Sequence, residues 1–140
     1  MSNLDLFADP HPLLHHVIII FSPSDASYRL VERHLERIPQ VELRWHSDTI
    51  EALADLFMSH PGIVVVFGDS NAQGYEFIRL VRNNPNFRDQ PIFAVLPEPE
   101  SFKDKMNKRA NIERFSTPID GPAMYKKALE VLKLKPVNPA

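Results

Sequence analysis

Three short runs of apolar, mostly β-branched residues constrain the fold of this chain more than any other feature. They are 16–21 (HVIIIF), 62–67 (GIVVVF) and 91–96 (PIFAVL). An uninterrupted apolar run of this length is typical of a strand that is buried on both faces. Such strands need cover on both sides, so we expect a parallel sheet between two layers of helices.

Amphipathic segments separate these runs and predict the helices. The second of them begins at Asp48, with Glu51 three residues later, in a pattern that resembles a capping box. Asp120 is placed to cap the last helix, with Pro122 in its first turn. By helical period, the expected inward-facing residues are Tyr28, Val31, Leu35 and Ile38; Ile50, Leu53, Ala54 and Phe57; Phe77, Ile78 and Val81; and Met124, Ala128, Val131 and Leu132.

Two shorter strands complete the pattern. Segment 41–45 (VELRW) alternates apolar and polar residues, which indicates a half-buried edge strand, and 112–116 (IERFS) is a further short strand. Segment 101–111 is expected to be a weak helix. Five repeats of strand then helix predict the α/β class, with a doubly wound, five-stranded parallel sheet of (βα)5 topology.

The length of 140 residues suits one domain. We expect an N-terminal arm over 1–15, the folded domain over 16–134, and a C-terminal tail or linker over 135–140. The tail contains two prolines and no apolar period, so both a stand-alone domain and a piece of a longer protein remain open.

Composition excludes several classes of function. The chain has no cysteine, which rules out disulfides and thiolate chemistry, and its net charge of −2 gives no bias toward nucleic acid or an anionic membrane. No apolar run approaches the roughly twenty residues that span a bilayer. The six histidines show no i, i+4 pair on one expected helix, and no Gly-x-Ser-x-Gly elbow is present. We therefore expect a cytoplasmic protein with no catalytic residues, no metal and no cofactor.

Any ligand site in such a sheet should lie beyond the carboxyl ends of the strands. The candidate loops are those after Phe21, Phe67, Leu96 and Ser116. The second loop contains GDSN (68–71), so Asp69 is either a functional carboxylate or a turn residue that bonds its own backbone.

The sequence resembles a response-regulator receiver domain over residues 16 to about 134. The phrases that carry the resemblance are GYEFIRLVR (74–82), RLVRNNPNFRDQPIFAVL (79–96) and FSTPID (115–120), in the order and spacing of the receiver's later helices and strands. The resemblance implies a bacterial two-component signalling protein. In an active receiver, two acids hold Mg²⁺, an aspartate accepts the phosphoryl group, and a hydroxyl and a lysine bind its oxygens.

The positions that match this site carry other residues here. Alignment on the strands places Phe21 and Ser22 at the acid pair, whereas alignment on the helices places Pro23 and Ser24 there. Of the remaining positions, the phosphoacceptor corresponds to Phe67, the hydroxyl to Leu96, and the lysine to Thr117; only the proline that follows, Pro118, is kept.

The resemblance therefore implies a degenerate receiver, or pseudo-receiver, that binds no Mg²⁺. Its expected function is phosphorylation-independent signalling through contact with a protein partner or a second copy, regulating an output domain. One alternative is an atypical receiver that is phosphorylated on Asp69, with Asp25 as the second acid. Another is a small flavodoxin-like ligand binder that uses the loop 22–27 (SPSDAS), although capping of the next helix by Ser24 or Asp25 is the simpler interpretation.

Without a reaction centre, function is expected to come from a surface. In receivers, the face formed by the fourth helix, fifth strand and fifth helix makes many of the contacts with partners. The corresponding residues here are Phe102, Lys103, Met106, Arg114 and Tyr125.

Overall fold

We describe a computed structural model of the chain over residues 16–67, 73–95, 111–116 and 118–134. Within these ranges, four α-helices of 11 or 12 residues accompany a single sheet. None of these helices combines the length and the apolar character that a membrane crossing requires.

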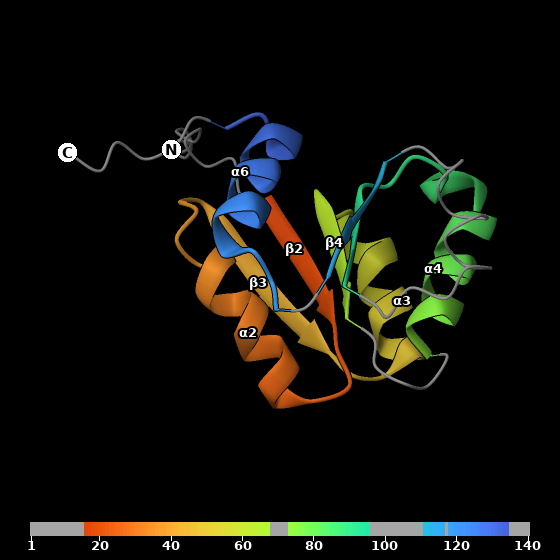
Figure 1. Cartoon of the computed structure of the whole chain (residues 1–140). Helices are drawn as coiled ribbons and strands as arrows, with labels where there is room; N and C mark the ends of the chain where they lie inside the picture. The colour runs from red at the N-terminus through yellow and green to blue at the C-terminus, as the bar shows by residue number, and fades with distance from the viewer. Residues whose placement is uncertain (1–15, 68–72, 96–110, 117, 135–140) are drawn as a thin grey trace, which may run out of the picture.

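Five parallel strands form the sheet in the described part of the chain, which confirms the predicted fold class (Figure 1). Their order is β3-β2-β4-β5-β6. Strand β2 lies between β3 and β4, with Ile18 opposite Leu43 on one side and Ile63 on the other. The strand bounds are β2 His16–Phe21, β3 Val41–His46, β4 Ile63–Phe67, β5 Ile92–Val95 and β6 Ile112–Phe115.

The helices cover both faces of the sheet (Figure 1). One face is covered by α2 (Asp25–Leu35) and α6 (Gly121–Leu132), and the other by α3 (Thr49–Ser59) and α4 (Gln73–Asn83). A short 3₁₀ helix, η1 (Pro85–Phe87), follows α4. Two apolar clusters result, one on each side of the sheet.

Short polar side chains begin three of the helices. The hydroxyl of Ser24 accepts from the backbone N–H of Ser27, and the carboxylates of Asp48 and Asp120 accept from Glu51 and Ala123. Each bond satisfies one of the N–H groups that the first turn of a helix leaves free. The predicted caps at Ser24, Asp48 and Asp120 are confirmed.

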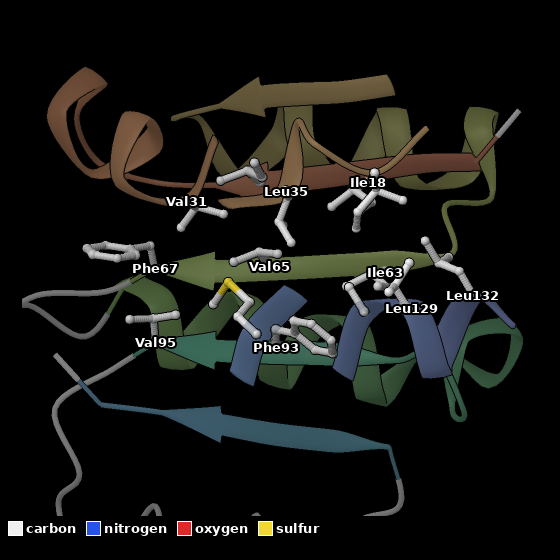
Figure 2. Packing of buried hydrophobic residues seen from close by; sticks show 14 residues of the cluster. Ile18, Val31, Leu35, Ile63, Val65, Phe67, Phe93, Val95, Leu129 and Leu132 are labelled. Carbon is white, nitrogen blue, oxygen red and sulfur yellow. The ribbon is translucent and has the colours of Figure 1, made fainter. Parts of the chain in front are cut away.

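The long apolar runs form the buried strands, as predicted. Every residue from Ile18 to Phe21, from Ile63 to Phe67 and from Ile92 to Val95 is buried. Side chains alternate along each strand, so neighbouring residues of β4 enter opposite clusters. Figure 2 shows this for Ile63, Val65 and Phe67, which all lie on the side of α2 and α6.

The prediction of the buried face of α3 is wrong. Ala52 and Leu56 are the buried residues, and Leu53 is partly buried, whereas Ile50, Ala54 and Phe57 are exposed. Apolar residues occur on two sides of this helix, so the helical period alone could not choose between them. Small and medium side chains at 52 and 56 let α3 lie close against the sheet.

Helices α2 and α6 meet closely at a glycine. An added Cβ on Gly121 would lie 2.3 Å from Nδ1 of His34 and 2.4 Å from its Cε1, which is inside van der Waals contact. Only glycine lets the ring of His34 lie against the first turn of α6.

Candidate functional site at the carboxyl ends of the strands

The order of the strands creates a switch point between β2 and β4. After β2 the chain forms β3 on one side of it, and then forms β4 on the other side. The connection after β2 runs toward β3, whereas the connection after β4 runs in the opposite direction, toward β5. In open parallel sheets, ligands bind at such a point, beyond the carboxyl ends of the two strands. Phe21 ends β2 and Phe67 ends β4, so aromatic side chains stand at both strand ends.

The ring of Phe21 fills the space between the sheet and α4. It is 2% exposed and stacks on Phe77, with ring centroids 4.5 Å apart and an angle of 14° between the planes. Phe77 is fully buried on the inner side of α4. A divalent cation requires oxygen ligands, and this pair presents only carbon at the end of β2.

Ser22 follows Phe21, and its polar groups are bonded within the chain. Its backbone N–H donates to the carbonyl of His46 at 3.0 Å, and its hydroxyl donates to the carbonyl of Ser24 at 2.8 Å. Its own carbonyl accepts from the indole N–H of Trp45 at 3.1 Å. The side chain is fully buried, so Ser22 serves to fix the turn from β2 into α2.

The rest of the loop into α2 is committed to starting the helix. The hydroxyl of Ser24 bonds both the backbone N–H and the hydroxyl of Ser27, at 3.2 and 3.1 Å. Asp25 is exposed and forms an ion pair with Arg29 one turn later, at 3.0 Å. Alignment on the helices puts Pro23 and Ser24 at the positions of the two acids, so it places no pair of carboxylates in this loop either.

Phe67 lies on the opposite side of the sheet from Phe21. It is 7% exposed and belongs to the cluster under α2 and α6. Figure 2 shows it at the arrowhead of β4, in the same layer as Val95, which ends the neighbouring strand. The two aromatic rings therefore fill the rim of the sheet on both faces.

A charged group joins β3 to α3 beside this rim. Arg44 Nη1 lies 2.7 Å from Asp55 Oδ1, and His46 Nε2 lies 2.8 Å from Asp55 Oδ2. The side chain of Asp55 is 11% exposed. Burial by itself would raise the pKa of Asp55, but the hydrogen bonds from His46 and Arg44 and the charge of Arg44 outweigh it, so this pKa is lowered.

Sequence reasoning missed the group formed by Arg44, His46 and Asp55. The spacing of Arg44 and His46 was an available signal, because residues two apart share one face of a strand. Their partner Asp55 lies on the next helix, and its approach depends on how α3 packs. Within the described ranges, no three histidine, aspartate or glutamate side chains are placed to hold a metal ion.

Several predicted site residues lie outside the described part of the chain. They are Asp69, Leu96 and Thr117 in the site, and Phe102, Lys103 and Met106 in the expected interaction face. Pro118 is described and exposed, and it lines a cavity of about 210 Å³ with Leu30 and Ile119. The assignments of these positions stay predictions.

Two residues of the expected interaction face, Arg114 on β6 and Tyr125 on α6, lie in the described part of the chain. Tyr125 is packed against the cluster under α2 and α6, and the guanidinium of Arg37 lies 5.0 Å above its ring. Arg114 alternates with Glu113 on β6 and so shares the side of Ile112, which packs with the α3 and α4 cluster.

No protein-family profile matches the sequence, and no curated protein matches it. Several solved structures are similar to this chain. A protein described as a response regulator from Chloroflexus aurantiacus has a TM-score of 0.68 and 20% identity, over 85% of this chain and 98% of that one. The Mn²⁺-bound form of response regulator Rcp1 has a TM-score of 0.64 and 21% identity, over 89% and 99%.

A third similar structure is the signal receiver domain of a histidine kinase from Syntrophus aciditrophicus. It has a TM-score of 0.68 and 15% identity, over 89% of this chain and 96% of that one. At these identities the likeness concerns the path of the backbone. Together with the strand order and the two helical layers, it shows that this chain has the fold of response-regulator receiver domains.

Proposed function

We propose that this chain is a degenerate receiver, a signalling module that works by contact with a protein partner or a second copy and accepts no phosphoryl group. The observation that supports it best is the stack of Phe21 on Phe77, next to the fully bonded Ser22. The receiver resemblance places the Mg²⁺-binding acids at Phe21 and Ser22 when the strands are aligned, and at Pro23 and Ser24 when the helices are aligned; neither pair contains an acid. Phosphoryl transfer to a carboxylate needs a cation to neutralise the incoming oxygens, and that cation needs oxygen ligands.

The packing also argues against a switch at this point. Acids crowded at a strand end repel one another, and a bound cation relieves that repulsion. Two buried rings in contact have no such repulsion, and they stabilise the same arrangement with and without ions. The proposed module therefore keeps one conformation, and its regulation comes from the partner rather than from a modification.

The loop 22–27 gives little support to a small-ligand function. The hydroxyls of Ser22 and Ser24 are engaged within the chain, and Pro23 has no N–H to offer an anion. The observed bonds are those of a helix cap. A bound flavin or nucleotide would nevertheless be easy to recognise by its absorption in the purified protein, so this measurement belongs in the test.

The decisive experiment follows the amide spectrum of the whole chain by NMR. Mg²⁺ is added first and beryllofluoride second, with a receiver that carries the full set of acids treated in parallel. We expect shifts in the control receiver and none above the noise in this chain. Shifts that spread from residue 67 onward would overturn the proposal. Their loss in Asp69→Ala would then identify Asp69 as the phosphoacceptor.

A further inference from the structure

Helix α3 has an apolar outer face. Ile50, Ala54, Phe57 and Met58 lie on one side of this helix, and we refer to them as the α3 stripe. Ile50 is 76% exposed, Phe57 46% and Met58 82%, and Ala54 is also exposed. Their spacing of four, three and one residues is that of a helix surface that packs against another helix.

The outer faces of the other described helices are mostly polar, with Leu30 on α2 as an exposed apolar residue. Helix α3 carries Asp48 and Glu51 at its start, but no lysine or arginine lies within it. A surface helix normally places charged residues away from the core, so the α3 stripe is an exception within the described fold. The exposed outer residues of the other three include Arg29 and Arg33 on α2, Glu76, Arg79 and Asn83 on α4, and Lys126 and Glu130 on α6.

We propose that the α3 stripe binds the α3 stripe of a second copy of this chain, with the two helices antiparallel. The order of residues in the α3 stripe is compatible with two-fold symmetry. Ile50 and Met58 lie four residues before and after Ala54, so a two-fold axis at Ala54 places Ile50 of each copy against Met58 of the other. Because alanine is small, the two helices can approach closely at the axis.

The charges at the two ends of α3 favour the antiparallel arrangement. The first end carries Asp48 and Glu51. At the other end, His60 follows the helix, and Arg88 follows Phe87, whose ring contacts both Phe57 and His60. Antiparallel packing brings the acidic start of one copy beside the far end of α3 of the other, whose last turn carries no acidic side chain, whereas parallel packing would bring the two acidic starts together.

The area of the α3 stripe sets the expected strength. With about 200 Å² for a large apolar side chain, the exposed parts of Ile50, Phe57 and Met58 amount to roughly 400 Å². Two copies would bury about 800 Å² from these side chains, less than the ~1,200 Å² of stable complexes. We therefore expect a weak, reversible dimer with a dissociation constant between micromolar and millimolar.

This inference deepens the proposed function, because it names the partner as a second copy and the surface as α3. It differs from the face around Arg114 and Tyr125, which the receiver resemblance suggests. Its test uses no Mg²⁺ and no phosphoryl donor, so its failure and the failure of the proposed function are separate results.

Sedimentation of the whole chain over a wide range of concentrations measures the dimer. Wild-type protein should show a rising average mass, and Met58→Glu should raise the dissociation constant at least tenfold. The new carboxylate would be buried against Ile50 of the other copy and next to its acidic helix start. Leu30→Glu is the matched control, because Leu30 is a 46% exposed apolar residue on α2, and this variant should associate like the wild type.

Single cysteines test the register, since the natural chain has none. Under mild oxidation, Ala54→Cys should form a disulfide dimer. A mixture of Ile50→Cys and Met58→Cys chains should give the mixed dimer in preference to either homodimer, and Leu30→Cys should remain monomeric.

Three results would overturn the inference. The first is a monomer at every concentration up to about 1 mM. The second is a dimer that Met58→Glu leaves unchanged, which would place self-association on another face. The third is cross-linking of Ile50→Cys with itself in preference to Met58→Cys, which would indicate parallel helices. Thermal melting of each variant at low concentration verifies that it folds.

Discussion

The ring of Phe21 lies almost flat on the ring of Phe77, with centroids 4.5 Å apart. This contact joins the end of the interior strand β2 to the inner side of α4, more than fifty positions later in the sequence. A stack of two fully packed rings contributes beyond the area that it buries. The rim of the sheet is therefore part of the hydrophobic core.

Removal of the ring of Phe21 should be costly. We expect Phe21→Ala to lower the free energy of unfolding by about 3–5 kcal/mol, because it leaves a cavity between β2 and α4. Urea unfolding at low protein concentration measures the change. Phe57→Ala removes the same atoms from a half-exposed position and should cost only about 1 kcal/mol. Equal losses in the two variants would contradict the packing described for Phe21.

Asp55 should stabilise the attachment of α3 to β3. In Asp55→Asn the hydrogen bonds with Arg44 and His46 are weakened, and we expect a loss of about 1–3 kcal/mol at neutral pH. Asp25→Asn breaks an exposed ion pair with Arg29 and serves as the control, with a change of about 0.5 kcal/mol or less. If Asp55→Asn lowers the free energy of unfolding no more than Asp25→Asn, the contacts of Asp55 with Arg44 and His46 contribute no more than an exposed ion pair.

The contribution of Asp55 should also depend on pH in a defined direction. Its pKa in the folded chain is lowered, so unfolding at acidic pH takes up a proton and is favoured. The advantage of the wild type over Asp55→Asn should thus be complete above pH of about 4 and should disappear as the pH falls through the lowered pKa. Urea unfolding of both proteins from pH 7 down to pH 3 measures the difference. A difference that stays constant would exclude this role of the carboxylate.

Gly121 should not accept alanine, although alanine favours helices. Its added methyl group would overlap the ring of His34, so we expect Gly121→Ala to cost about 1–3 kcal/mol. The reason is specific and can be tested with a double-mutant cycle. In a His34→Ala background the ring is gone, and the same substitution at Gly121 should cost little. If the losses in the two single variants simply add in the double variant, the cost of Gly121→Ala does not come from overlap with the ring of His34.

Trp45 should report on the turn after β2. Its indole N–H bonds the carbonyl of Ser22, and its ring stacks on Tyr28 at 5.5 Å between centroids. Trp45→Phe keeps the ring contact but leaves that carbonyl without its donor, with an expected loss of about 1 kcal/mol. Tyr28→Leu removes the stack and retains the bond. Trp45 is the sole tryptophan of the sequence, so it alone gives the tryptophan fluorescence. The emission of the folded Tyr28→Leu variant should therefore differ from that of the folded wild type.

Local chemistry made much of the fold predictable. The runs at 16–21, 62–67 and 91–96 are almost entirely apolar and contain many β-branched residues, a pattern that favours buried strands. The caps at Asp48 and Asp120 were equally readable, since a carboxylate at that position bonds the backbone three residues later. These features depend on neighbours in the sequence.

Features that depend on distant partners could not be predicted. Helix α3 has apolar residues on two sides, and only its packing against the sheet decides that Leu56 is buried while Ile50 is exposed. The donor to the carbonyl of Ser22 comes from Trp45, on the next strand. At the site, comparison with receivers predicts residues other than acids at the end of β2, but it could not predict the stacking of Phe21 on Phe77.

The placement of Phe21 and Phe67 on opposite faces of adjacent strands has a mechanical consequence. Each ring anchors a different helical layer to the same edge of the sheet, so neither layer can tilt there without disturbing the other. Both helical layers are thus tied to the same two neighbouring strands at this edge of the sheet.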